Sequence, residues 1–266
     1  MNALVPDSTV AIVTGAGSGI GRETALALAS RVSTVIAVGR RADKLLETAV
    51  LSDCRILPLT CDVSVTSDRA ALRETARKVG RVRYLVHCAG IHLQRPATEI
   101  TEADWAAVMA VNVTARMFLT IDLIDDFSYG ARVLFVGSHS ATRARPGGAA
   151  YSVSQAASTM LRACLQTELS SRNVHVGIAI PSPAHTAMID QQMAADATRY
   201  PDALEYRRLR DAGGLVSPRA VGRFFDWLLS GVSEAEFASQ SWNIRDQGHH
   251  AHWLGDQPLC GVAPKR

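Results

Sequence analysis

Residues 9–21 read TVAIVTGAGSGIG, and this stretch decides which fold the chain can adopt. Its first five residues are apolar and rich in β-branched side chains, as in a strand that is buried on both faces. A turn with four glycines follows, and the sequence then has helical periodicity to Ser30. A strand, a glycine turn and a helix form the first half of a βαβ unit, whose glycines let backbone N–H groups approach a pyrophosphate. We therefore expect a dinucleotide to contact Gly15, Ser18, Gly19, Ile20 and Gly21.

The rest of the chain alternates apolar runs with helical stretches. Further strands are expected at residues 34–38, 55–59, 84–88, 132–136, 174–180 and 242–244. Helices are expected at residues 42–50, 67–79, 102–127, 149–171 and 219–229. This alternation indicates an α/β fold built on a doubly wound parallel sheet flanked by helices. With 266 residues and 47% hydrophobic side chains, the chain suits one domain over residues 1–266.

Composition narrows the classes of function. The net charge is +3 and the arginines are scattered, so no nucleic-acid footprint is visible. The five cysteines are odd in number and form no C-x-x-C pair, as in a protein with reduced thiols. No apolar run approaches the ~20 residues of a membrane span, and the N-terminus lacks the pattern of a signal peptide. We expect a cytoplasmic protein with neither a nucleic acid nor a membrane as partner.

The glycine spacing differs from that of most dinucleotide folds. It reads T-G-x-x-x-G-x-G from residue 14, and in this it resembles the short-chain dehydrogenase/reductase family. Later motifs follow in matching order up to Thr186, and residues 215–221 with the N-I-R-D at 243–246 look most like the sepiapterin or benzil reductase branch. The resemblance implies a Rossmann-type fold and hydride transfer between a nicotinamide cofactor and a small-molecule substrate.

The end of the second strand indicates which cofactor is bound. Gly39 is followed by Arg40 and Arg41, at the point where such folds bind the adenosine ribose. An acidic residue there would bind the 2′-hydroxyl of NAD, whereas an arginine accommodates the 2′-phosphate of NADP. Arg40 therefore favours NADP. The alternative is that both arginines only begin an exposed helix.

The resemblance implies further cofactor contacts from the motifs that match. These are Asp62 and Val63 at the adenine ring, Ala89 and Gly90 beside the cofactor, Gln155 at the nicotinamide ribose, and Pro181 and Thr186 near the carboxamide. Alternatively or in addition, Asp62 or Ser64 caps the helix that follows. The family's N-N-A-G is changed to His87-Cys88-Ala89-Gly90, and we interpret His87 as a structural histidine whose polar atoms are satisfied.

The stretch GSHSATRARPGGAAYSVSQ at residues 137–155 carries the proton chemistry that the resemblance implies. Tyr151 would protonate the forming alkoxide, Ser138 would bond the same oxygen, and Asn112 would hold a relay water. Asn112 interrupts an apolar stripe of helical spacing, so it can also be a buried amide with a structural role. Position 155, where the family has Lys, is Gln155.

This exchange bears on the direction of the reaction. Lys would bond the ribose and lower the pKa of the tyrosine, whereas Gln can keep the bond but has no charge. Alcohol oxidation needs Tyr151 as phenolate, while reduction needs it as the neutral phenol that it is at pH 7. We therefore expect an NADP(H)-dependent reductase of a small carbonyl or imine. The alternatives are a dehydratase, cyclase or isomerase that uses Tyr151 as acid and base, or a nucleotide-binding protein without turnover.

Three other regions complete the sequence-based expectations. Residues 184–214 have mixed polarity and are expected to cover the substrate. The helices around Asn112 and Met160 carry extra apolar residues, which predicts a homodimer or homotetramer. The tail holds His249, His250 and His252, but no carboxylate or cysteine completes a metal site at familiar spacing, so no metal is expected.

Overall fold

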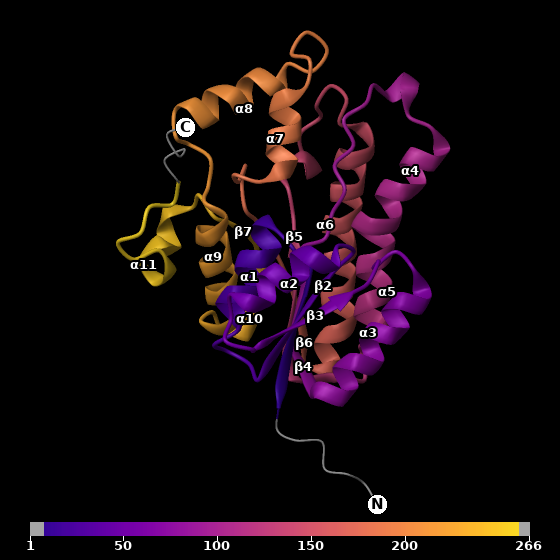
Figure 1. The fold of residues 1–266 in the computed structure, drawn as a ribbon, viewed down its shortest axis with the longest axis vertical. Coiled ribbons are helices and arrows are strands. Elements are labelled where there is room, and N and C mark those ends of the chain that lie inside the picture. Colours follow the sequence, from indigo (N-terminus) through magenta and orange to yellow (C-terminus); the bar gives the residue numbers. More distant parts are fainter. Residues whose placement is uncertain (1–7, 261–266) are drawn as a thin grey trace, which may run out of the picture.

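A single parallel sheet runs through the molecule in the computed structural model, which describes residues 8–260 (Figure 1). Its strands are β1 (Thr9–Thr14), β2 (Thr34–Gly39), β3 (Ile56–Thr60), β4 (Arg81–His87), β5 (Phe127–Val136), β6 (Val174–Ile180) and β7 (Ser241–Asn243). They lie in the order β3-β2-β1-β4-β5-β6-β7, and each neighbouring pair is parallel. The doubly wound parallel sheet predicted from the sequence is confirmed.

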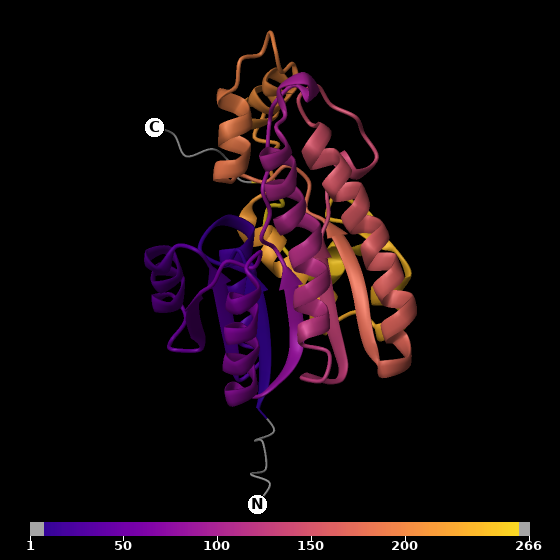
Figure 2. The same cartoon turned by 90° about the vertical axis from the view of Figure 1, so that its right-hand side faces the viewer.

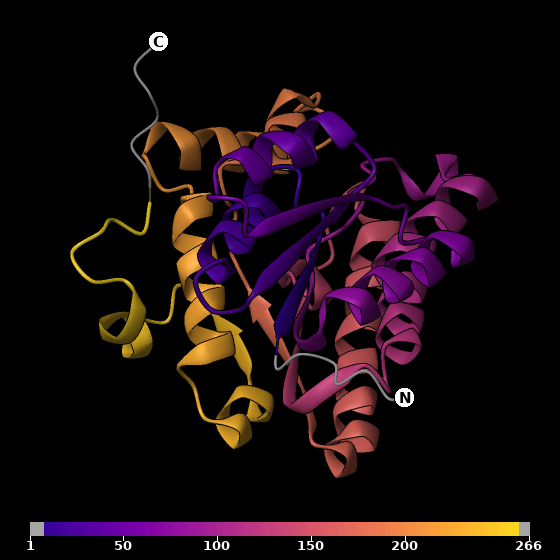
Figure 3. The ribbon, with the colours of Figure 1, turned by 60° about the horizontal axis from the view of Figure 1, so that its bottom comes forward.

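Helices cover both faces of this sheet (Figure 3). They are α1 (Gly19–Leu28), α2 (Ala42–Val50), α3 (Thr66–Val79), α4 (Glu102–Met109), α5 (Ala115–Asp122), α6 (Ala149–Leu169), α7 (Ala187–Ala194), α8 (Asp202–Asp211), α9 (Pro218–Ser230), α10 (Glu234–Ser239) and α11 (His250–Trp253). Core residues from α1, α9 and α10 pack on one face, and those from α3, α5 and α6 pack on the other. None of these helices, within residues 8–260, combines the length and apolar character that crossing a membrane requires.

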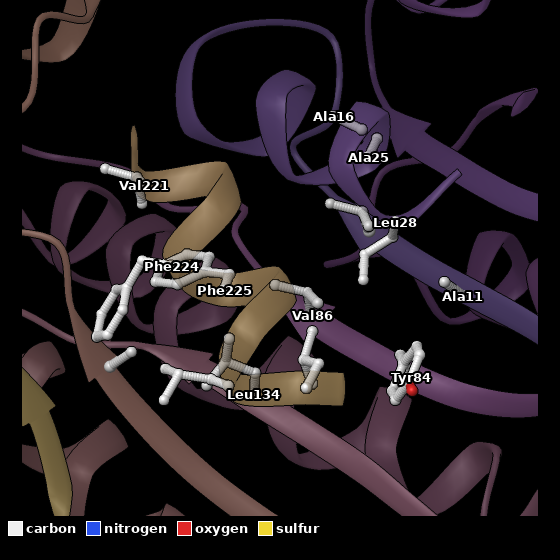
Figure 4. Packing of buried hydrophobic residues seen from close by; sticks show 14 of the residues in the cluster. Ala11, Ala16, Ala25, Leu28, Tyr84, Val86, Leu134, Val221, Phe224 and Phe225 are labelled. Carbon is white, nitrogen blue, oxygen red and sulfur yellow. The ribbon is translucent and has the colours of Figure 1, made fainter. Parts of the chain in front are cut away.

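The first strand shows why the apolar runs have no alternation. Ala11 and Val13 of β1 belong to the core on the α1 and α9 side, while Val10 and Ile12 belong to the opposite core. Figure 4 shows the first of these cores, where Leu28 of α1 and the phenylalanines of α9 gather over the sheet. A strand that is buried on both faces must be apolar at every position.

The long helix expected at residues 102–127 is interrupted, and the stripe expected to be buried is partly exposed. A π-helical turn, Ala110–Thr114, separates α4 from α5, and the helix ends at Asp122. Trp105 is 40% exposed and Phe118 is 48% exposed, so neither belongs to the core. The π turn inserts an extra residue and rotates the following helix. Asn112 within the turn is buried, as the sequence allowed, and so is Arg116, which follows the turn.

The segment at residues 184–214 forms α7 and α8, which lie beyond the carboxyl ends of the strands (Figure 2). They share a small apolar cluster that includes Ile189, Met193 and Tyr206. An ion pair of 2.5 Å between Arg145 and Asp202 joins α8 to the loop that precedes α6. The helix pair is thus anchored next to Tyr151.

Candidate active site

A cavity of about 520 Å³ lies at the carboxyl ends of β1, β2 and β4. In open α/β sheets, ligands bind where the strand order reverses, and here β1 lies between β2 and β4. Most of the residues predicted to bind the cofactor line this cavity: Gly15, Ser18, Gly19, Ile20, Gly21, Arg40, Asp62, Val63, Ala89, Gly90 and Thr186. We call it the nucleotide cavity.

The glycine turn has a backbone shape that fits a pyrophosphate. Gly15 and Gly19 have φ angles of +69° and +55°, in the left-handed region that glycine tolerates. A Cβ on Gly21 would lie 2.3 Å from the carbonyl oxygen of Gly15, so a side chain there would force the helix away from the turn. Helix α1 begins at Gly19, and the free N–H groups of a helix N-terminus favour an anion.

Two arginines stand at the adenosine end of the nucleotide cavity. Nη1 of Arg40 lies 4.0 Å from Oδ2 of Asp62, and Nη2 of Arg41 donates to the Ser18 hydroxyl at 3.2 Å. Both arginines line the cavity, so Arg41 is a residue that the sequence-based list omitted. These two positive charges suit a phosphate group on the ribose.

Asp62 does not cap the helix as the alternative interpretation supposed. The N-cap residue of α3 is Val65, and no side chain caps it. Instead, Asp62 accepts hydrogen bonds from the backbone N–H of Ser64 at 3.0 Å and from its hydroxyl at 2.6 Å. The Ser64 hydroxyl is the main reason that the pKa of Asp62 is lowered. Its carboxylate is thus fixed in a turn at the cavity wall.

A second cavity, of about 160 Å³, adjoins the first. The two share the lining residues Ile20, Cys88, Gly90, Thr186 and Met188. Ser138, Tyr151, Gln155 and Pro181 also line this second cavity, which we call the proton cavity. Three of the four predicted catalytic residues are therefore brought together, next to the predicted cofactor site.

Tyr151 lies in the first turn of α6 and its ring packs 4.5 Å from the ring of His92. Burial raises the pKa of Tyr151, while the Ser138 hydroxyl and the charge of Arg116 act against this rise. Burial also lowers the pKa of His92 to about 4. At neutral pH the site therefore presents a neutral phenol next to a neutral imidazole.

Gln155, for which the sequence resemblance predicts the position of the family's Lys, has one polar atom without a partner in the described part of the chain. Its side chain is 3% exposed, and Oε1 is buried without a hydrogen-bond partner in the described part of the chain. A buried carbonyl oxygen without a donor is costly. A ribose hydroxyl would supply that donor, so the residue fits the sugar of a nicotinamide nucleotide.

The turn after β6 contains a residue in the left-handed backbone region. Ser182 has a φ angle of +58°, in the region that favours glycine. Its hydroxyl is buried and has no partner among the described residues. This strained residue lies between Pro181 and Thr186, which face the two cavities, so the position is consistent with a site that holds a ligand.

Asn112 lies outside both cavities. It is fully buried in the π turn, where Oδ1 accepts from the N–H of Ile91 at 2.8 Å. Nδ2 donates to the Ile91 carbonyl and to the Ser154 hydroxyl, each at 2.9 Å. Both amide hydrogens are thus used to join the loop after β4 to α6. The relay water stays a prediction, and it would have to bond Oδ1 or the backbone.

His87 lies in the core, away from both cavities. It is 2% exposed, and its Nε2 lies 2.9 Å from the Thr120 hydroxyl. Burial lowers its pKa well below the usual range, so the ring is neutral. These features agree with a structural histidine, and its role stays a prediction.

The histidine tail belongs to an aromatic cluster. His249 accepts at Nδ1 from the Trp253 indole at 2.9 Å, and its Nε2 lies 2.9 Å from the Asn243 carbonyl. His250 bonds the Ile244 carbonyl. Among residues 8–260 no group of three potential ligands is placed to hold a metal ion.

Arg116 is a second residue, besides Arg41, that the sequence did not lead us to expect in the site. It is 3% exposed and lines the proton cavity from α5. The available signal was its position four residues after Asn112, which places it on the same helix face. Arginine is rarely buried unless it has a partner, so an arginine on the same face as a buried Asn indicates a residue with a specific role.

The parallel sheet with its glycine turn defines a doubly wound dinucleotide-binding protein. Residues 9–197 match the family model described as short chain dehydrogenase. The chain therefore belongs to the short-chain dehydrogenase/reductase family, a family of oxidoreductases.

Several characterised proteins are similar to this chain. It is 30% identical to 2,3-dihydro-2,3-dihydroxybenzoate dehydrogenase of Bacillus subtilis, over 71% of this chain and 74% of that protein. It is 29% identical to carbonyl reductase family member 4 of Danio rerio, over 68% and 78% respectively. A crystal structure from Beutenbergia cavernae, described as an NAD(P)-dependent gluconate 5-dehydrogenase with NADP at low occupancy, has a TM-score of 0.73 and 27% identity over 91% of this chain and 96% of that one.

Proposed function

We propose that this protein is an NADP(H)-dependent reductase that reduces a carbonyl or imine of a small molecule, with Tyr151 as proton donor. The observation that carries the proposal is the arrangement of Tyr151 and Ser138 in a cavity that adjoins the glycine-lined nucleotide cavity. Gln155 stands beside them in place of a cation. The relatives named carbonyl reductase and dehydrogenase support the reaction class.

Ser138 and Tyr151 of the proton cavity have different roles in the proposed reduction. Ser138 holds the substrate oxygen, and Tyr151 gives it the phenolic proton as negative charge develops there. A bound reduced nicotinamide would supply the hydride to the substrate carbon. Tyr151 is left as phenolate and regains a proton from water, so the net reaction consumes one proton and one reduced cofactor.

The state of Tyr151 favours the reductive direction. Burial raises its pKa, so the phenol stays protonated at neutral pH. We expect the reduction rate to be constant over neutral pH and to decrease only as alkaline pH removes this proton. Efficient alcohol oxidation by the parent protein at neutral pH would contradict this assignment.

The cofactor preference rests on Arg40 and Arg41. Both line the adenosine end of the nucleotide cavity, and no carboxylate ends β2. The similar structure with bound NADP supports the same choice here. Asp62 is the acidic residue nearest to Arg40, at 4.0 Å. Its carboxylate already accepts hydrogen bonds from Ser64, so we do not expect it to bind a ribose hydroxyl as the acid of an NAD site does.

A panel of small carbonyls, imines and alcohols tests the proposal. Each reaction is followed both by NADPH absorbance and by the mass of the substrate. Loss of NADPH with a gain of two hydrogens in the product supports reduction. A changed substrate with no NADPH loss would show non-redox chemistry instead, and binding with no product from any compound would favour a nucleotide-binding protein without turnover.

We also propose a homodimer or homotetramer. Trp105 of α4, Phe118 of α5, and Val153 and Met160 of α6 are between 40% and 66% exposed. Helices α4 and α6 contact each other, and exposed apolar side chains on such helices are suited to a symmetric interface. Light scattering at micromolar concentration would contradict the proposal by giving the mass of a monomer.

A further inference from the structure

The proton cavity contains a buried positive charge, on Arg116, to which the proposed reduction assigns no role. Arg116 of α5 lines this cavity together with Tyr151 and Gln155. The arginine is 3% exposed, and its Nε is buried without a partner in the described chain. Because arginine rarely gives up its proton, this is a buried cation.

Two hydrogen bonds hold the guanidinium beside the catalytic residues. Nη1 donates to the Val136 carbonyl at 3.0 Å and to the Ser158 hydroxyl at 2.8 Å. Val136 ends β5, two residues before Ser138. Ser158 lies on α6 seven residues after Tyr151 and three after Gln155, which places all three on one helix face. The tethers therefore fix the charge at the same patch that holds the phenol.

No anion within residues 8–260 neutralises this cation. No carboxylate of the described residues forms an ion pair with Arg116, and none of the residues that line the proton cavity is acidic. The other arginine of that lining, Arg145, is paired with Asp202 at 2.5 Å. A buried charge with no counter-ion is strongly unfavourable.

The groups that face Arg116 identify where an opposite charge can arise. They are the ring of Phe135 at 5.7 Å, the neutral His87, the Cys88 thiol and the Tyr151 phenol. Burial raises the pKa of Cys88 to about 12, so this thiol stays neutral. Burial lowers the pKa of Arg116 only to about 10, so its charge persists at neutral pH. Tyr151 is the group whose proton leaves during the reaction.

We infer that Arg116 supplies to Tyr151, from a different helix, the positive charge that Gln155 lacks. The inference rests on the proposed reductive function. When the O–H bond of Tyr151 breaks and its proton joins the substrate oxygen, the electron pair stays on the phenol oxygen. Arg116 stabilises this phenolate until water returns a proton. The two tasks of the family's Lys are thus divided: Gln155 bonds the ribose, and Arg116, as a positioning residue, provides the charge.

Ultraviolet titration of the tyrosinate of Tyr151 tests this directly. Each spectrum is taken as the difference from a matched Tyr151→Phe protein, which isolates one of the five tyrosines. Arg116→Met should raise the pKa of Tyr151, whereas Arg116→Lys, which keeps the charge, should leave it near the parent value. An unchanged titration in Arg116→Met would overturn the inference. If Arg116→Met does not fold, Arg116→Gln is used instead, since it keeps a hydrogen-bond donor for Ser158. A raised pKa of Tyr151 in that variant supports the inference, and an unchanged pKa overturns it.

Arg132→Met is the matched control. Arg132 is also a buried arginine, 5% exposed, but it bonds the Leu228 carbonyl and lies outside the proton cavity. It should not change the titration of Tyr151, and an equal shift in both variants would contradict a specific role for Arg116. The titration needs neither cofactor nor turnover. It can therefore succeed or fail independently of whether the protein proves to be a reductase. In the rate assay, Arg116→Met should lower NADPH-dependent reduction about tenfold without raising the KM for NADPH.

Discussion

The two adjoining cavities are built in different ways. The nucleotide cavity is shaped largely by the backbone of one short turn, where Gly15, Gly19 and Gly21 lie within seven residues. The proton cavity is assembled from side chains of separate elements, with Ser138 after β5, Tyr151 on α6 and Arg116 on α5. The first depends on local backbone geometry, whereas the second depends on how distant helices pack.

This difference determines how each cavity can evolve. A glycine turn that must admit a pyrophosphate has few substitutes, because any side chain would occupy the space of the backbone or the ligand. A positive charge near a phenol can come from any element that reaches it. If Arg116 acts as proposed, the proton cavity can hold Gln in place of Lys on α6 because α5 supplies the cation.

The largest effect is expected for Tyr151→Phe. Without the phenolic proton, the reduction rate should fall by about 10²- to 10⁴-fold, while the affinity for NADPH should not change. Steady-state rates and a fluorescence titration of the cofactor measure the two quantities. A residual rate within tenfold of the parent would show that another group donates the proton.

Gly21→Ala tests the nucleotide cavity. The new Cβ would lie 2.3 Å from the Gly15 carbonyl oxygen, so the turn must deform. We expect about a 100-fold loss of NADPH affinity, equivalent to about 3 kcal/mol. Gly248→Ala is the control, because Gly248 lines neither cavity and its Cβ would meet only the Asp246 side chain, at 3.2 Å. Equal affinities in the two variants would show that the turn tolerates a side chain.

The sequence was sufficient to predict the features that local geometry determines. The predicted helix at residues 42–50 and strand at residues 174–180 match α2 and β6. The glycine turn follows β1 and leads into α1 as expected, and the predicted cofactor residues all line one cavity or the other. In these segments the residues that cause the structure are neighbours in the chain.

The features that were missed depend on contacts between distant segments. After the π turn, Phe118 of α5 is exposed, while Arg116 of the same helix is buried and faces the proton cavity. Hydrophobic periodicity assumes a regular helix and cannot register such a turn. The partners of Arg116 lie 20 and 42 residues away, and only the folded chain brings them together.

A smaller effect is expected at the adenosine end of the nucleotide cavity. Arg40→Asp should weaken NADPH about tenfold and leave NADH nearly unchanged, because the 2′-phosphate loses a positive partner and meets a negative one. Arg41→Ala should have a similar effect, since this side chain contacts Ser18 at the glycine turn. Fluorescence titration with each cofactor measures the difference in affinity between NADPH and NADH. Equal affinities for NADPH and NADH in the parent would remove the argument for NADP.

The smallest effect is expected for Gln155→Lys in the parent. A Lys one helical turn from Tyr151 adds a second cation to a cavity that already contains Arg116. It should lower the pKa of Tyr151 further and increase alcohol oxidation more than reduction. The gain should be only about threefold, because the first cation already stabilises the phenolate. Steady-state rates in both directions measure it.

The same substitution should have a larger effect when Arg116 is removed. In an Arg116→Met background, Gln155→Lys supplies the only cation of that pair, so it should recover most of the lost rate. The four proteins form a double-mutant cycle. The gain from Gln155→Lys should be larger without Arg116 than with it, as expected for two groups that can replace each other. A gain of equal size in both backgrounds would mean that Arg116 does not act on Tyr151. If both redox directions stay silent in all four proteins while substrate is consumed, the site performs non-redox chemistry, and Gln155 reflects the loss of hydride transfer rather than a relocated charge.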